Sequence, residues 1–137
     1  MSKIEKVIFA AAASLLVVAG NLIPDAAQAQ QTGTHRTDLS RNDISIPGWE
    51  AVQVRVDIDP GKIAPNHRHP GEEIIYVVEG TILYQLEGKP PATLKAGDVL
   101  FVPKGVIHSA KNVGQTNAAE IGTYIVPKGK PLVEWIR

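Results

Sequence analysis

The chain has 137 residues, which is enough for one domain. Its 14 basic and 14 acidic side chains balance, so the charge indicates neither nucleic acid nor an anionic membrane surface as a partner. It contains no cysteine, which excludes a disulfide scaffold, a thiolate nucleophile, a cysteine-ligated zinc and an iron–sulfur cluster.

Residues 1–29 have the pattern of a secretory signal peptide. Two lysines precede an apolar run over residues 7–20, and Ala27-Gln28-Ala29 matches the small-x-small cleavage site. A spanning helix needs about 20 apolar residues, so the shorter run favours cleavage over a retained anchor. Without a twin-arginine pair, we expect Sec-type export to the periplasm or the medium.

The stretch that follows the predicted cleavage site is polar and rich in turn residues. We expect residues 30–48 to form an N-terminal arm, loose over Gln30 to Arg41, with His35 as a solvated side chain. The remaining residues, 49–137, are then the single folded domain. The predicted organisation is therefore signal peptide, arm and domain.

Short strands separated by turns dominate the predicted domain. Residues 52–58 alternate between apolar and polar side chains, as in a strand with one buried face. Further strands are predicted at 73–78, 81–86, 99–102, 106–110 and 119–126. Ten prolines and twelve glycines supply the turn signals, which recur about every eight to twelve residues. This spacing predicts an all-β sandwich or barrel, and no segment of the domain has a helical apolar period.

Three of the four histidines are placed to share a metal. His67 and His69 are two residues apart, so on a strand both point to the same face. Glu73 keeps that parity, with Pro70-Gly71 allowing a bend, and His108 comes from a distant strand. Three imidazoles and a carboxylate suit Fe, Mn, Ni, Co, Cu or Zn as divalent ions. A His-x-His pair alone is a weak signal and also occurs by coincidence on surfaces.

The spacing around these four residues is more specific. In the first motif five residues separate Gly61 from the His67-x-His69 pair, three more precede Glu73, and six precede Gly80. The second motif places His108 within a similar frame, namely Gly97, Pro103, Gly105 and Asn112. Over residues 52–126 the chain therefore resembles the cupin superfamily. The sixteen residues between the motifs, 81–96, are a short gap like that of compact bacterial single-domain cupins.

The resemblance implies a cupin jelly-roll barrel, also called a double-stranded β-helix, with a divalent metal inside. It implies that His67, His69, Glu73 and His108 are the metal ligands. The metal is then Fe, Mn, Ni, Cu or Zn, without a choice among them. The resemblance does not fix the reaction, because one fold hosts many functions.

Three functions follow as hypotheses. The first is an exported metal-dependent enzyme of dioxygenase or oxidoreductase type, acting on a small organic substrate that chelates the metal. In it Glu73 could also serve as a catalytic base. The second is a non-catalytic periplasmic module that binds or senses a small molecule. The third is a metal-dependent isomerase or lyase. We expect a homodimer, since an open sheet edge needs covering.

Apolar and aromatic side chains are predicted to line the interior. Ile75 and Val77 share strand parity with Glu73. The candidate aromatic walls are Tyr84, Phe101 and Tyr124, although ordinary core or sheet-face packing is the favoured interpretation of each, because barrel interiors need filling. Trp49 and Trp135 lie outside the motifs and could cap the barrel or join a dimer contact.

Overall fold

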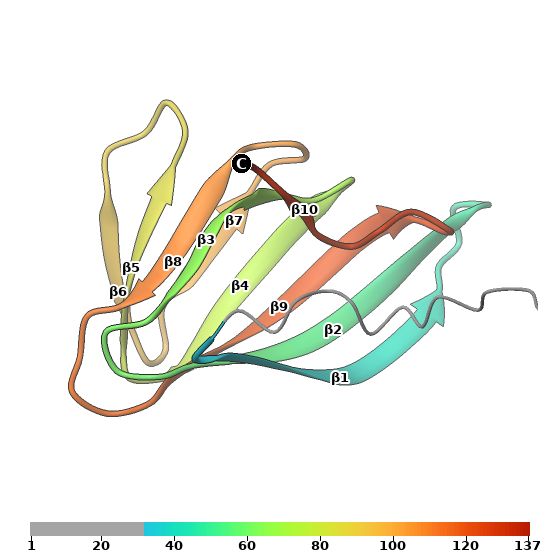
Figure 1. Ribbon diagram of the computed structural model, residues 1–137. Coiled ribbons are helices and arrows are strands. Elements are labelled where there is room, and N and C mark those ends of the chain that lie inside the picture. The colour runs from blue at the N-terminus through green and yellow to red at the C-terminus, as the bar shows by residue number, and fades with distance from the viewer. Residues whose placement is uncertain (1–31) are drawn as a thin grey trace, which may run out of the picture.

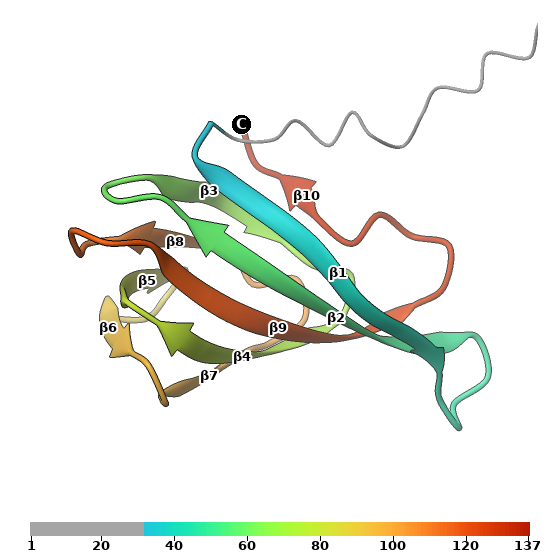
Figure 2. The same cartoon turned by 90° about the horizontal axis from the view of Figure 1, so that it is seen from below.

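The computed structural model describes residues 32–137, so the predicted signal peptide lies outside the described residues. The described chain forms ten strands in two five-stranded sheets. Figure 1 shows the two sheets facing each other, and Figure 2 shows one sheet in front of the other. Within residues 32–137 there is no helix that is long and apolar enough to cross a membrane.

All strand pairs are antiparallel. Sheet A contains, in spatial order, β1 (Thr34–Asp43), β2 (Trp49–Ile58), β9 (Ala118–Pro127), β4 (Glu72–Glu79) and β7 (Val99–Val102). Sheet B contains, in spatial order, β10 (Glu134–Trp135), β3 (Ile63–Arg68), β8 (His108–Asn112), β5 (Thr81–Leu86) and β6 (Ala92–Lys95). The chain passes from one sheet to the other several times, and the predicted all-β jelly-roll barrel is confirmed.

Alternating side chains place the core between the two sheets. In β2 the residues at every second position, Val52, Val54, Val56 and Ile58, are at most 2% exposed. Sheet B contributes Ile82, Tyr84 and Leu86 from β5 and Ala110 from β8 to the same cluster. A strand with period-2 hydrophobicity can bury only one face, so the outer faces of both sheets remain polar or partly exposed.

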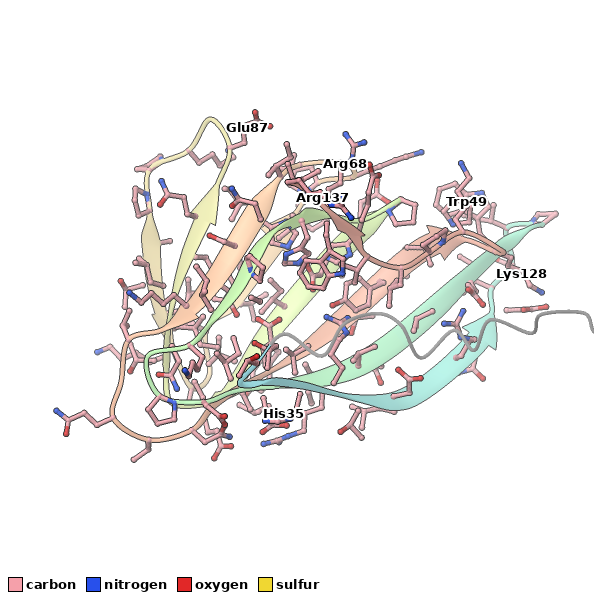
Figure 3. The ribbon with its side chains drawn as sticks, viewed as in Figure 1. His35, Trp49, Arg68, Glu87, Lys128 and Arg137 are labelled. Atoms are coloured by element: carbon pink, nitrogen blue, oxygen red, sulfur yellow. The ribbon has the colours of Figure 1, made fainter. Side chains whose placement is uncertain are left out.

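The N-terminal segment differs from the expected loose arm. From Thr34 onward it forms β1, which pairs with β2 along nearly its whole length. Most of its side chains are exposed, so the strand is held by backbone hydrogen bonds and lacks the apolar alternation that predicts a strand from sequence. His35 is exposed as predicted, and Figure 3 shows it pointing away from the space between the sheets.

The C-terminal segment crosses between the sheets. After β9 of sheet A it continues to β10, which pairs with β3 of sheet B. Residues 128–133 make this crossing, as Figure 1 shows. This crossing brings main-chain atoms of the tail to the histidines described below.

Candidate metal centre

Two of the candidate ligands lie side by side on adjacent strands of sheet B. His67 on β3 is the direct cross-strand partner of His108 on β8. The register of the two strands is irregular between Ala64 and His67, and irregularities of this kind re-aim side chains next to functional sites. Both side chains are buried, and their ring centroids lie 4.3 Å apart.

The other two candidates come from the crossing between β3 and β4. His69 directly follows β3 in sheet B, whereas Glu73 belongs to β4 in sheet A. Gly71 allows this crossing because it lies against β9, where a Cβ atom would be 1.9 Å from the carbonyl oxygen of Ile125. The two side chains therefore meet from opposite sheets. The sequence also predicted that His69 and Glu73 meet, but because of their parity along one strand.

A backbone carbonyl holds the Nδ1 atom of each of the three imidazoles. The Nδ1 atoms of His67, His69 and His108 donate to the carbonyl oxygens of Pro65, Leu132 and Val106, at 2.6, 2.7 and 3.0 Å. In the neutral ring this leaves the Nε2 lone pair free. One ligand nitrogen from each ring lies within 4.8 Å of the other two, so the three histidines converge on one point.

Glu73 completes the group from sheet A. Its Oε2 atom lies 3.2 Å from Nε2 of both His69 and His108. Burial alone would raise the pKa of Glu73, but its interactions with His108 and His69 outweigh burial and lower that pKa well below the usual range. Burial and the neighbouring rings of His108 and His69 lower the pKa of His67 to about 3. Near neutral pH the centre therefore holds a carboxylate and at least one neutral imidazole.

The donor set fits a divalent metal. The 3.2 Å contacts lack hydrogen-bond geometry, and both Nε2 of His69 and Oε2 of Glu73 are buried without a hydrogen-bond partner in the described chain. A buried polar atom without a partner costs about 1–3 kcal/mol, so such atoms call for a missing partner. Imidazole nitrogens and a carboxylate oxygen are the donor types that Fe, Mn, Ni, Cu and Zn accept.

Aromatic side chains surround the imidazoles. Trp135 on β10 packs against His67 with ring centroids 5.2 Å apart. Tyr124 on β9 packs against His69 in an edge-to-face arrangement, with ring centroids 4.7 Å apart. Of the predicted walls Tyr84 and Tyr124 are buried, as are Ile75 and Val77. Phe101 is wrong as a wall: it is 55% exposed, because Val102 takes the inward position of β7.

The sequence reasoning missed a second buried carboxylate. Glu120 lies on the inner face of β9, is 5% exposed and accepts a hydrogen bond from the hydroxyl of Tyr84. Burial, followed by the charge of Glu73, raises the pKa of Glu120 to about 7. The available signal was its parity with Tyr124 in a strand that is otherwise free of charged residues.

Glu120 predicts a pH-dependent stability in the metal-free protein. An acid whose pKa is higher in the folded state than its usual 4.5 stabilises the fold fully below pH 4.5, and this contribution is lost as the pH rises through 7. We expect Glu120→Gln to gain stability relative to the parent over that range, by about 3 kcal/mol, because each pKa unit between 4.5 and 7 corresponds to about 1.4 kcal/mol. Chemical unfolding at several pH values in the presence of a chelator measures the difference. Glu87→Gln, at an exposed position, is the control. A constant difference from pH 4.5 to 8 would contradict the prediction.

Comparison with known proteins agrees with this geometry. Residues 54–127, which hold all four candidate ligands, match the cupin domain family. The chain belongs to this family. A germin-like protein of Arabidopsis thaliana, subfamily 2 member 1, is 36% identical over 91 residues, which are 61% of this chain and 42% of the relative. The cupin chain thus spans less than half the length of that relative.

Solved structures share the fold. A cupin-like protein from Thermotoga maritima superimposes with a TM-score of 0.61 and 27% identity, covering 75% of each chain. A recombinant oxalate oxidase in complex with glycolate superimposes with a TM-score of 0.63 and 26% identity, covering 78% of this chain and 57% of the other. These likenesses support a metal-dependent cupin and leave the reaction open.

Proposed function

We propose that this cupin is a metal-dependent enzyme of dioxygenase or oxidoreductase type that acts on a small metal-chelating organic substrate. In this proposal His67, His69, His108 and Glu73 hold one divalent ion. The observation that carries the proposal is the convergence of three oriented imidazoles and one carboxylate on a buried point. Four protein ligands leave positions on a six-coordinate ion for substrate, and open positions are typical of catalytic metal sites.

Each residue has a separate task in this proposal. When bound, the metal supplies Lewis acidity and, if it is redox-active, electron transfer. The carbonyls of Pro65, Leu132 and Val106 accept hydrogen bonds from the Nδ1 atoms and so fix the orientation of each ring toward the metal. Glu73 is a carboxylate at neutral pH and is the group proposed to accept a proton from a substrate hydroxyl, although its lowered pKa makes it a weak base. The surrounding aromatic rings limit the access of water.

Metal analysis combined with oxygen uptake tests the proposal. The purified protein is analysed for metals and then screened with enols, diketones and phenols, in air and under anaerobic conditions. Substrate-dependent oxygen consumption with Fe, Mn, Ni or Cu supports the proposal. Turnover that persists with a redox-inert ion and without oxygen would replace it with an isomerase or lyase. Ligand binding without turnover across the screen would favour the binding module.

We also propose that the protein is exported to the periplasm or the medium after cleavage of residues 1–29. The basic start, the apolar run and the Ala27-Gln28-Ala29 site support this. Amino-terminal sequencing of protein recovered outside the cytoplasm should begin at Gln30. Recovery of the intact amino terminus in the cytoplasm would contradict it.

We propose a homodimer that forms through the outer face of sheet A. Two cross-strand pairs between β4 and β7, Ile74 with Phe101 and Tyr76 with Val99, place four apolar side chains on this face, each at least 43% exposed. Strand β7 also forms an edge of the sheet. A second copy related by a twofold axis offers the same edge and the same apolar pairs, which makes the surface self-complementary.

Phe101→Glu should convert this dimer to a monomer, because the substitution puts a charge at the centre of the apolar pairs. Analytical ultracentrifugation at tens of micromolar, roughly the range for a specific contact, measures the change. Val113→Glu, at another exposed apolar position away from the patch, should leave the dimer intact. A parent protein that is monomeric at this concentration would contradict the proposal.

A further inference from the structure

A cleft lies beside the metal centre, between β1 and the segment that follows β9. It has a volume of about 650 Å³ and is lined by Arg36, Asp38, Arg41, Gly129, Lys130, Pro131 and Leu132. Two of these residues connect it to the centre. The carbonyl oxygen of Leu132 accepts the hydrogen bond from His69. Arg36 donates a hydrogen bond of 3.3 Å to the hydroxyl of Tyr124, and the ring of Tyr124 contacts His69.

Arg36 is a guanidinium that has no described carboxylate at ion-pair distance, although the buried carboxylates of Glu73 and Glu120 act on it from farther away. It lies half-buried on the inner face of β1, opposite the buried Val56. The other arginines with ion pairs in residues 32–137 contact Glu50, Asp57, Glu79 or Glu134, whereas Arg36 forms no ion pair with a described carboxylate. Its contact with the Tyr124 hydroxyl uses one of five N–H donors. The remaining donors are available for a planar anion.

The net charge of the cleft indicates how many negative charges an anion bound at Arg36 would carry. Arg36, Arg41 and Lys130 are positive, and Asp38 is the carboxylate among the lining residues. Arg41 is also paired with the buried Glu50. Among the lining residues and Glu50, one positive charge is left uncompensated, while the buried carboxylates of Glu73 and Glu120 act on Arg36 from the interior. A monoanion matches this charge better than a doubly charged phosphate, because its single negative charge balances the single positive charge of the cleft.

The walls of the cleft indicate the rest of the ligand. Pro131 and Leu132 contribute apolar surface to the same cleft as Arg36, so an apolar body can pack there while its anionic end meets the guanidinium. Arg36 is separated from the imidazole of His69 by the single ring of Tyr124. A ligand held at Arg36 is thus close to the metal centre but is recognised by different atoms.

We propose that this cleft is a carboxylate subsite, in which Arg36 binds the acid group of an organic monocarboxylate with an apolar body. The inference rests on the proposed function, because it assigns the substrate of that site to the class of small organic acids. The acid group on Arg36 is then recognised by atoms other than those of the four candidate metal ligands. Lys130 adds a weaker, solvent-exposed attraction.

Benzoate is a suitable probe because it combines one carboxylate with an apolar ring. It is titrated into isotope-labelled, metal-free protein while amide signals are followed by NMR. We expect saturable shifts at Arg36 and residues 129–132. Benzamide, which is neutral and of the same shape, should bind at least about tenfold more weakly, the loss typical of a missing charged hydrogen bond. Inorganic phosphate should bind no more tightly than benzoate.

Variants separate Arg36 from general charge. Arg36→Met should weaken benzoate binding by about tenfold or more, and Lys130→Met by a few fold, since an exposed ion pair contributes less. Arg55→Met, at a position on the outer face of β2 away from the cleft, is the matched control and should leave the affinity unchanged. Equal affinity for benzoate and benzamide, or full affinity in Arg36→Met, would overturn the proposal.

The same titration of zinc-loaded protein separates this proposal from the proposed function. Benzoate bound to the metal instead would shift signals of His67 and His108 and would be insensitive to Arg36→Met, which also overturns the subsite. The titration needs no turnover, so an absence of catalysis leaves its result valid. Conversely, loss of the subsite in Arg36→Met should leave the metal content unchanged.

Discussion

Replacing His67 by alanine should remove the bound metal while leaving the β-barrel intact. The substitution deletes one of three converging nitrogens and the only imidazole that faces His108 across β3 and β8. The loss of a ligand should weaken metal affinity by at least about a hundredfold. Losing a residue that only holds a ligand in place already weakens affinity by up to about that factor. The core does not depend on this side chain, because its cluster consists of apolar residues and two tyrosines.

Metal content by mass spectrometry and far-ultraviolet circular dichroism measure the two halves of this prediction. His35→Ala is the matched control, because it removes an exposed histidine on β1 that pairs only with Asp59. The control should retain stoichiometric metal. If His67→Ala kept its metal, His67 would leave the ligand set. If instead the variant lost its β structure, the barrel would depend on the ion more than the apolar core implies.

A methyl group at Gly71 should damage both the fold and the centre. In Gly71→Ala the new Cβ would lie 1.9 Å from the carbonyl oxygen of Ile125, a backbone atom that can yield only if β9 or the crossing moves. We expect a loss of about 3 kcal/mol in the free energy of unfolding, at the upper end of overpacking effects. Because Gly71 lies between His69 and Glu73, the displacement should also reduce metal affinity.

Gly114→Ala provides the comparison for this substitution. A Cβ at Gly114 would meet only the amide oxygen of Asn112 at 3.4 Å, an ordinary contact. Replacing glycine by alanine at a compatible position changes stability by less than about 1 kcal/mol. Chemical unfolding measures both variants. Equal stability of Gly71→Ala and Gly114→Ala would contradict the close approach of the crossing to β9.

The convergence of the four candidate ligands was predictable from sequence largely because these residues carry local signals. His67 and His69 differ by one strand period, and the glycine and proline spacing around them and around His108 is specific enough to indicate the family. The alternation in residues 52–58 likewise predicted the buried face of β2. These features depend on neighbouring residues, so periodicity can detect them.

What the sequence could not provide depends on register between distant strands. β1 has few buried side chains and is stabilised by pairing with β2, so its own residues carry no apolar period. Phe101 was one of three candidate aromatic walls, yet the parity of β7 directs Val102 inward instead. Glu120 and Arg36 approach the centre only through the pairing of β9 and β1 with β2.

X-ray absorption spectroscopy at the metal edge of the zinc-loaded protein tests the ligand set most directly. The account predicts three imidazole nitrogens at about 2.0–2.1 Å and an oxygen ligand at a similar distance. The scattering pattern of imidazole rings gives their number, and the count should fall to two or fewer in His67→Ala but remain three in His35→Ala. A parent spectrum with one imidazole or none, or a spectrum that His67→Ala leaves unchanged, would contradict a metal held by His67, His69, His108 and Glu73.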